Sequence, residues 1–170
     1  GSGGTILQWS GSSWAAVASG TMMNLRSLWG SDANNLWAVG EGGTILRWNG
    51  SFWTAAATAG LTGQPLYGLW GTAADNVWAV GFNGTVLRWD GSTWSVVPGS
   101  TTLSLFAVWG SDANNIWAAG TGGILQRWTG SSWSTVSGGT SQSLTAVWGS
   151  DAHTVWGEGE GGDRLWYSLQ

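Results

Sequence analysis

The residues best suited to ligand chemistry in this sequence are three arginines that recur at one position of a repeated pattern. Arg47, Arg88 and Arg127 each directly precede a Trp, and a second Trp follows five residues after the first; the Trp pairs are Trp48 and Trp53, Trp89 and Trp94, and Trp128 and Trp133. A guanidinium group donates several hydrogen bonds in a fixed geometry, and an indole ring offers a large flat face. These nine residues are the candidate ligand-binding residues, and they predict one binding position in each repeat.

The same residues also support a structural interpretation. Trp48 and Trp53 flank a four-residue hairpin loop, which places them opposite each other as a cross-strand pair. Each indole can bury about 150–250 Å². The pairs therefore either hold neighbouring sheets together or form stacking platforms for sugar rings, and both roles can apply to different positions.

An acidic residue recurs in a turn of each repeat. Asp32, Asp112 and Asp151 are in register, and Asp75 is displaced by two positions. One Arg and one acid per repeat predict an ion pair between sheets or a capped turn. The alternative is a repeated polar pocket in which Arg and carboxylate bind sugar hydroxyls beside a Trp.

The sequence contains no set of residues typical of an active site or a metal centre. His153 is the single histidine, cysteine is absent, and the two tyrosines, Tyr67 and Tyr167, lie in predicted strands. Catalysis requires different residues that converge on one pocket, and a zinc site requires several ligands. We therefore predict no catalytic residue, no metal and no cofactor, and a protein that is not an enzyme.

Charge and hydropathy exclude further classes. Five arginines and no lysine stand against nine acidic residues, which gives a net charge of −4. Nucleic-acid binding usually requires a dense basic patch, so no nucleic-acid partner is expected. No apolar run reaches the roughly 18 residues of a membrane-spanning helix. No charged segment followed by an apolar stretch opens the sequence, so no signal peptide is visible.

A repeat organises the whole chain. The segment WGSDANNLWAVG starts at Trp29 and WGSDANNIWAAG at Trp109, with ten of twelve positions identical; diverged copies start at Trp70 and Trp148. The starts are 41, 39 and 39 residues apart. This period is typical of the blades of a β-propeller.

Each repeat resolves into four short strands separated by turn residues, predicted in the first copy at Leu25–Trp29, Leu36–Val39, Thr44–Trp48 and Trp53–Ala57. The second strand is apolar on both faces, as in sheets stacked between two neighbours. The sequence predicts an all-β fold, a β-propeller of four-stranded antiparallel blades with about four blades per chain. In the first turn, Asn34 and Asn35, like Asn114 and Asn115, are expected to adopt left-handed geometry.

The predicted domain is a single propeller over residues 1–170, with repeats starting near 29, 70, 109 and 148. Strands within residues 4–18 match the third and fourth strands of a repeat and are expected to complete the last blade. Residues 163–167 match a third strand as well, so two segments compete for one place. The ring is closed either by strands from both termini or by a second chain, and the unpaired strand edge predicts self-association. Strand positions near the ring axis carry small residues: Ser27, Gly68, Ala107 and Ala146.

The turn between the third and fourth strands carries a family resemblance. Leu87-Arg88-Trp89-Asp90-Gly91-Ser92-Thr93-Trp94 resembles a shortened Asp-box turn of sialidase-like (BNR) propellers and of photosystem II assembly-factor-type propellers. The Trp-Asp-Gly-x-x-Trp hairpin is also similar to that of propeller lectins. The sequence departs from the Asp-box in the other turns, where Asn49, Thr129 and Ser10 replace Asp90. The resemblance implies the fold and a bacterial binding module that is secreted or displayed on the cell surface.

Two functions from different classes remain open at this stage. The first is a non-catalytic, multivalent carbohydrate-binding (lectin-like) module, whose repeated weak sites for glycans gain strength through avidity. The second is a structural or self-assembling scaffold with no small-molecule ligand. Such a scaffold would be a recently duplicated or designed repeat, or a fragment of a larger propeller.

Overall fold

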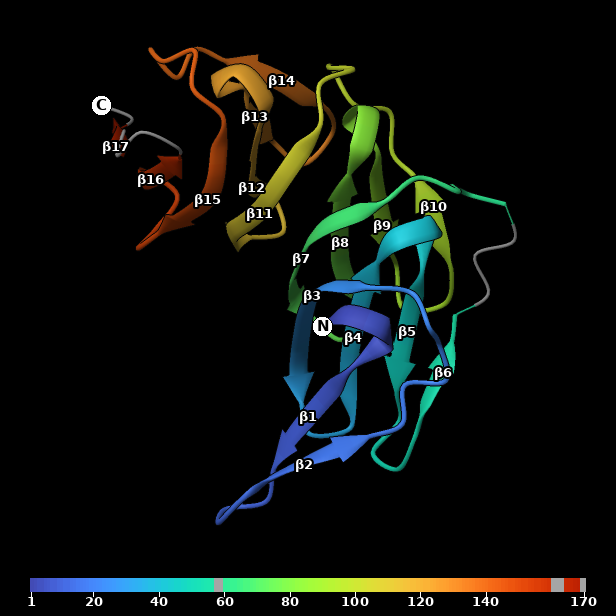
Figure 1. Cartoon of the computed structure of the whole chain (residues 1–170). Coiled ribbons are helices and arrows are strands. Elements are labelled where there is room, and N and C mark those ends of the chain that lie inside the picture. Colours follow the sequence, from blue (N-terminus) through green and yellow to red (C-terminus); the bar gives the residue numbers. More distant parts are fainter. Residues whose placement is uncertain (57–59, 160–163, 169–170) are drawn as a thin grey trace.

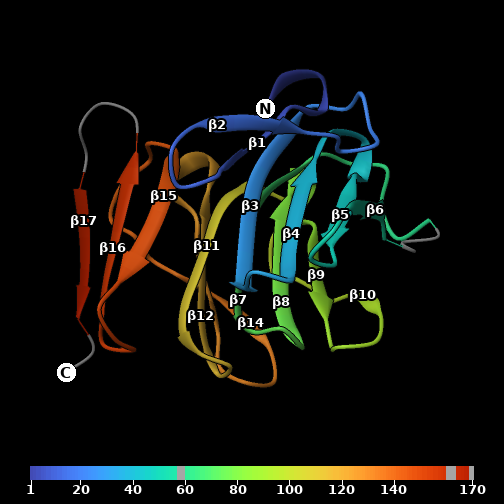
Figure 2. The ribbon, with the colours of Figure 1, turned by 90° about the horizontal axis from the view of Figure 1, so that it is seen from below.

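The computed structural model describes residues 1–56, 60–159 and 164–168. The chain forms five antiparallel sheets that stand side by side along an open arc (Figures 1 and 2). Three of them are complete four-stranded blades, one at the C-terminal end has three strands, and one at the N-terminal end has two. The predicted all-β fold with four-stranded antiparallel blades is confirmed. Ala57 and Asp163, at the limits of two predicted strands, lie outside the described residues.

The strands follow the chain order within each sheet. Blade 1 contains β3 (Leu25–Asp32), β4 (Asn35–Gly40), β5 (Ile45–Trp48) and β6 (Trp53–Ala55). Blade 2 contains β7 (Leu66–Ala73), β8 (Asn76–Gly81), β9 (Val86–Trp89) and β10 (Trp94–Val96). Blade 3 contains β11 (Leu105–Asp112), β12 (Asn115–Gly120), β13 (Leu125–Trp128) and β14 (Trp133–Val136). The C-terminal sheet contains β15 (Leu144–Gly149), β16 (Thr154–Gly159) and β17 (Arg164–Ser168), and the N-terminal hairpin contains β1 (Ile6–Trp9) and β2 (Trp14–Val17).

Short 3-10 turns join the second and third strands of the blades, and a similar turn precedes β1. They are η1 (Ser2–Gly4), η2 (Glu41–Gly43), η3 (Phe82–Gly84) and η4 (Thr121–Gly123). The middle residue of each turn has left-handed backbone geometry, with φ of 64° at Gly42 and 52° at Asn83. Glycine and asparagine tolerate this geometry best, so the sequence of these turns follows from their shape.

The ring is not closed within one chain. β1 pairs with β2, and β16 pairs with β15 and β17. Figure 1 shows β1 and β2 at the blade 1 end of the arc and β15–β17 at its other end. The expectation that residues 4–18 complete the last blade is therefore not met inside a single chain, because the arc does not bend far enough to bring its two ends together.

The hydrophobic core lies in layers between successive blades. Between blades 1 and 2, Trp37 and Val39 of β4 join Leu66 and Val77 of the next blade in one buried cluster. The second-strand tryptophans are almost fully buried, with exposed fractions of 1%, 0% and 0% for Trp37, Trp78 and Trp117. The prediction that these tryptophans lie between blades is confirmed. Because both faces of blades 2 and 3 are covered, these blades have little room for charged side chains.

The inner strands pack through tryptophan rings that lie over glycines of the next blade. A Cβ atom placed on Gly71 would lie 2.8 Å from the Trp29 ring, and one on Gly110 would lie 2.8 Å from the Trp70 ring. At Gly149 the corresponding distance to the Trp109 ring is 2.6 Å. Each blade thus offers a Trp ring on one side and a glycine that receives a ring on the other, and any side chain at these glycines would displace the Trp.

Candidate functional site

The three predicted arginines lie in the layers between blades rather than on an open surface. The guanidinium carbon of Arg88 is 5.2 Å from the centre of the Trp78 ring, and Arg47 and Arg127 lie 5.3 Å and 5.4 Å from the equivalent rings of Trp37 and Trp117. All three are half-buried. These distances are typical of cation–π contacts, so the arginines stabilise the tryptophans on which they lie.

The polar partner of each arginine is an asparagine. Arg88 Nε donates to Asn76 Oδ1 at 3.0 Å, and Arg127 donates to Asn115 Oδ1 at 3.0 Å. Arg47 makes a longer contact of 3.4 Å with Asn35. The predicted ion pair with the turn acid is wrong, because the asparagine stands between the two charged groups.

The turn acid instead caps its own turn, which was the other predicted role. Asp32 accepts hydrogen bonds from the backbone N–H of Asn34 at 2.9 Å and from the Asn35 side chain at 2.9 and 3.0 Å. The backbone N–H of Asn34, with the Asn35 and Ser31 side chains, lowers the pKa of Asp32 because these donors favour the carboxylate. The expected left-handed geometry is wrong for Asn34 and Asn35 and equally for Asn114 and Asn115, because among the described residues Asn83 is the one non-glycine with positive φ.

The six predicted tryptophans of the hairpin pairs belong to the core. Their exposed fractions lie between 5% and 9%. The rings of Trp89 and Trp94 are 6.0 Å apart and contact Trp37 of the preceding blade at 4.9 and 5.2 Å. Trp37 thus covers Trp89 and Trp94, and Trp78 covers Trp128 and Trp133 in the same way, so these two pairs do not form open stacking platforms. A cavity of about 200 Å³ lined by Trp37, Arg47, Trp89 and Thr93 is the space beside them.

A different set of residues, which the sequence analysis did not single out, lies on an accessible face. In each blade the inner strand carries a β-bulge directly after its first leucine, as the register shift between Leu25 and Ser27 shows. The bulged residues are Arg26, Tyr67, Phe106 and Thr145. A bulge re-aims the extra side chain away from the sheet pattern. Four different residues thus occupy one position whose preceding residue is always leucine, and this variation was the signal in the sequence.

The bulged residues interact with one another and with the 3-10 turns. The rings of Tyr67 and Phe106, from neighbouring blades, are 5.5 Å apart. Arg26 forms an ion pair with Glu41, the first residue of η2, which also accepts a hydrogen bond from the Asn24 side chain at 3.0 Å. The hydrogen bond from Asn24, followed by that from Arg26, lowers the pKa of the Glu41 carboxyl. The pair is therefore held in its charged form.

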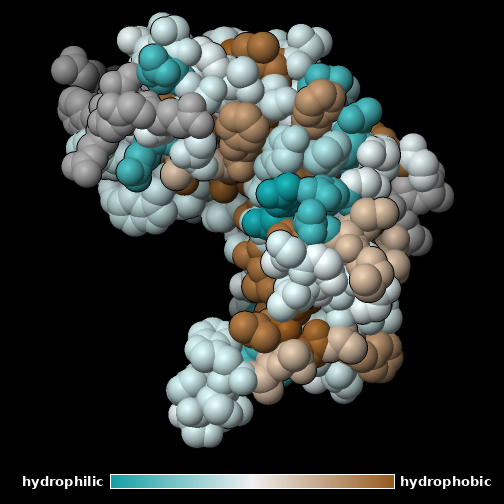
Figure 3. Space-filling view, viewed as in Figure 1, coloured by the Kyte–Doolittle hydropathy of each residue, from teal (hydrophilic) through white to brown (hydrophobic). Residues whose placement is uncertain are grey.

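These bulged side chains and the first residues of the 3-10 turns form what we call the turn face: Arg26, Glu41, Tyr67, Phe82 and Phe106. Figure 1 looks onto the 3-10 turns along this side, and the same view in Figure 3 shows hydrophilic and hydrophobic patches side by side. The opposite face carries the hairpins between the third and fourth strands. Phe52 lies in one of those hairpins and is 56% exposed.

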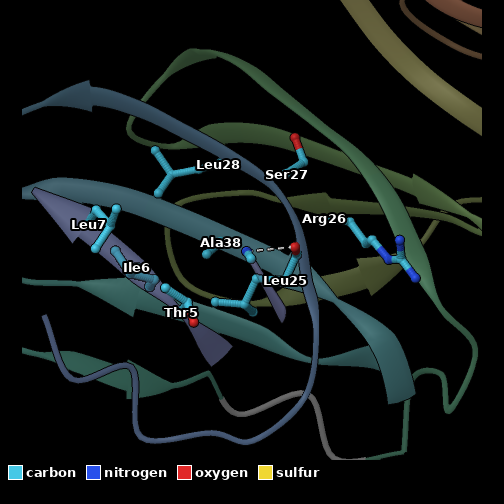
Figure 4. Close-up of a pocket in the computed structure, with 9 residues that line it drawn as sticks. Thr5, Ile6, Leu7, Leu25, Arg26, Ser27, Leu28 and Ala38 are labelled. Atoms are coloured by element: carbon cyan, nitrogen blue, oxygen red, sulfur yellow. Dashed lines mark hydrogen bonds between the residues drawn. The ribbon is translucent and has the colours of Figure 1, made fainter. Parts of the chain in front are cut away.

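A second cavity of about 200 Å³ lies between β1 and β3 at the edge of the turn face. Figure 4 shows Ile6 and Leu7 on one side of it, with Leu28 and Ala38 nearby, while Arg26 is directed away. The N-terminal amino group donates to the Leu25 carbonyl at 2.9 Å and fixes the start of the chain beside it. Polar residues such as Thr5 and Ser27 line the cavity together with the apolar side chains, so its interior is mixed in character.

Comparison with known proteins supports this architecture. YCF48 from Cyanidioschyzon merolae superposes with a TM-score of 0.73 at 18% identity, over 98% of this chain and 64% of that one. The fold is that of a β-propeller. The WD40 propeller domain of Doa1 gives a TM-score of 0.71 at 11% identity over 98% and 61% of the two chains, and YCF48 bound to D1 peptide gives 0.66 at 15% over 81% and 47%.

The chain spans less than two thirds of the length of each of these three propeller structures. At these identities the likeness establishes the fold alone. No family model and no curated protein sequence matches the chain. The specific Asp-box, sialidase-like relationship is therefore not confirmed, whereas the propeller repeat is.

Two further properties bear on function. Within residues 1–56, 60–159 and 164–168, no group of three or more His, Cys, Asp or Glu side chains could hold a metal ion. Over the same part of the chain, no helix is long and apolar enough to cross a membrane.

Proposed function

We propose that this propeller is a non-catalytic binding module whose turn face binds an extended segment of another protein. The observation that carries the proposal is the bulged position of the inner strands. It places Arg26, Tyr67 and Phe106 on one face, and it differs from blade to blade although the surrounding framework repeats. A face that binds one particular partner needs different side chains along its length, whereas the framework of the blades can repeat the same ones.

The chemistry of the face suits a peptide. Tyr67 and Phe106 form a contiguous aromatic surface, and aromatic residues and arginine are enriched where proteins bind one another. The side chains of Arg26 and Glu41 are 50% and 33% exposed, so both signs of charge lie at one end. A segment with apolar side chains over the two rings and polar groups beside the ion pair would be complementary. The bulges sit on rigid strands, so the face is preorganised and little ordering is needed on binding.

The likeness to YCF48 bound to D1 peptide supports the same choice, because a propeller of similar architecture there binds a peptide. Carbohydrate binding at Arg47, Arg88, Arg127 and the Trp pairs stays a prediction. The burial of those tryptophan rings does not favour it, since an exposed aromatic face is what a sugar ring would stack on. Secretion or surface display likewise stays a prediction from the sequence.

The proposal is tested by selecting binders from a phage-displayed library of random peptides on the immobilised chain. The affinity of a selected, fluorescently labelled peptide is then measured by anisotropy for variants of the turn face. Tyr67→Ala and Phe106→Ala should each weaken binding by about tenfold or more, as expected for aromatic hot spots. Phe52→Ala, an exposed aromatic on the opposite face, is the matched control and should leave the affinity unchanged.

Selected peptides that bind Tyr67→Ala and Phe106→Ala as tightly as the original chain would refute the assignment, as would a library that yields no binder. A glycan array probed with the same protein covers the lectin alternative. Glycan binding that is lost in Arg88→Ala but kept in Phe106→Ala would favour the site between blades instead.

A further inference from the structure

Successive sheets of the arc pack through one kind of interface, which occurs three times between blade 1 and the C-terminal sheet. The two ends of the arc expose the two halves of this same interface. We call the side of blade 1 that carries Gly30 and Leu28 the leading face, and the side of β15 and β16 that carries Trp148 the trailing face. Every interface between complete blades joins a trailing side to a leading side. The question is therefore what covers these two faces.

The inner-strand tryptophans show the complementarity most directly. Trp29, Trp70 and Trp109 each lie over a buried glycine of the following blade, whereas Trp148, at the equivalent position of β15, is 61% exposed. At the other end Gly30 is exposed, and no tryptophan ring is among the atoms closest to it. Trp148 thus has no glycine of a following blade beneath it, and Gly30 has no Trp ring of a preceding blade over it.

The rest of the leading face has the same character. Leu28 is 51% exposed, but the residues at its position in the other blades, Leu69, Val108 and Val147, are 7–8% exposed. An apolar groove of about 310 Å³ runs between this face and the N-terminal hairpin, lined in part by Leu28, Leu36, Trp48 and Trp53. The groove lies where the inner strands of a preceding blade would pack.

The N-terminal hairpin marks the position of that blade. Ile6 of β1 joins Leu25, Ala38 and Leu46 in one cluster, just as Ile45 joins Leu66, Ala79 and Leu87 one blade later. β1 and β2 are therefore placed as the third and fourth strands of a blade. At the trailing end, β15 and β16 form the first and second strands of a blade and can complement them.

We infer that two copies of this chain associate head to tail, with β15 and β16 of one copy packed on the leading face of the other and paired edge to edge with its N-terminal hairpin. In this composite blade Trp148 lies over Gly30 of the second copy, and β1 of the second copy takes the place beside β16 that β17 holds in the single chain. The register of the other blades, in which Leu36 faces Trp48 and Ala38 faces Leu46, then sets Val155 opposite Trp9 and Gly157 opposite Leu7.

The exposure of the hairpin is accounted for by the same arrangement. Leu7, Trp9 and Trp14 are 53%, 50% and 65% exposed, whereas their respective counterparts in blade 1, Leu46, Trp48 and Trp53, are 2%, 9% and 8% exposed. A composite blade would bury the first set as the chain buries the second. It would also pair the free edge of β1, which otherwise remains a template for unspecific association.

Two copies close the ring by symmetry. Each copy holds three complete blades and the outer half formed by β1 and β2, and it presents β15 and β16 as an inner half once β1 of the other copy replaces β17. Two copies then hold eight blades, two of which are identical composite blades. A pair related by a two-fold axis satisfies both ends of both chains, whereas any other number of copies would require a different curvature. The faces involved do not include the turn face, so this inference is independent of the proposed function.

The mass in solution tests the association. Multi-angle light scattering over a range of concentrations should give twice the chain mass of 17.7 kDa. Trp148→Ala and Leu28→Glu change residues that are exposed in the single chain, so both should fold, as checked by circular dichroism. Each should weaken the dimer by about tenfold or more, and Phe52→Ala should not change it.

Cross-linking tests the strand exchange itself, because the chain contains no cysteine of its own. Leu7→Cys and Gly157→Cys chains, refolded together and oxidised, should form a disulfide between copies, since the two residues become cross-strand neighbours. Leu7→Cys refolded with Val96→Cys, on the outer strand of blade 2, is the control and should not cross-link. A single-chain mass at high concentration, a ladder of larger masses, or a dimer without the specific disulfide would each overturn the inference.

Discussion

Replacing Trp78 with alanine tests the physical basis of the fold most sharply. The ring is fully buried between blades 2 and 3 and lies 5.1 and 5.6 Å from the rings of Trp128 and Trp133. Arg88 lies over it at 5.2 Å. Large-to-small changes of a buried Trp cost about 3–5 kcal/mol, and the lost aromatic and cation–π contacts favour the upper end of that range. A domain of ordinary stability, about 5–15 kcal/mol, would lose a large share of it.

The free energy of unfolding is measured by urea denaturation followed by circular dichroism in the strand region. Trp78→Phe is expected to lie between the original chain and Trp78→Ala, because it keeps most of the apolar volume. The indole Nε1 atom of Trp78 has no hydrogen-bond partner among the described residues, so the loss of its N–H should add little. Phe52→Ala, which removes an exposed ring, should change the free energy by less than about 0.5 kcal/mol. A loss below about 1 kcal/mol in Trp78→Ala would refute the assignment of this ring to the core.

Two further predictions concern polar groups. The pKa of Asp90 is lowered to about 2, mainly by the backbone N–H of Thr93 and then that of Ser92, so its folded-state pKa lies below the unfolded value. The stabilisation is therefore present above pH of about 4 and is lost as the pH falls towards 2. In Asp90→Asn, which copies the acceptor that Asn49 provides in blade 1, the free energy of unfolding measured by urea titration should depend less on pH over this range. Arg88→Ala should lower the free energy of unfolding by about 1–3 kcal/mol, because it leaves the buried Asn76 side chain without one hydrogen bond; an unchanged urea midpoint would contradict the role of Arg88 between blades.

The blade pattern could be predicted because the repeat fixes the same residue at every equivalent position. Trp37, Trp78 and Trp117 recur in a strand that is apolar on both faces, and a strand of this kind must be covered on both sides. The strand limits were predicted less well. β3 continues to Asp32 because the ladder pairs Asp32 with Asn35 around the turn, and polar turn residues give no sign of such pairing in the sequence.

The site was predicted less successfully than the fold. Arg47 and Asp32 recur together, and charge alone favours an ion pair, but the distance between them is bridged by Asn35. The bulges that carry the half-buried Tyr67 and Phe106 depend on how two strands pair, so the sequence of one strand does not reveal them. The pattern that marks them is variation inside a repeat, whereas the predicted site residues are those that recur unchanged.

The contact between a Trp side chain and the glycine of the next blade also bears on how a propeller gains blades. An extra copy of the repeat would carry its own Trp side chain on one face and its own glycine on the other. It would therefore fit between any two blades without a new kind of contact. Duplication is then limited by the angle that each blade adds, since a ring must close on a whole number of blades. In such a protein the number of blades can change before any interface does, and Gly71, Gly110 and Gly149 are the positions at which a single added methyl group would end that freedom.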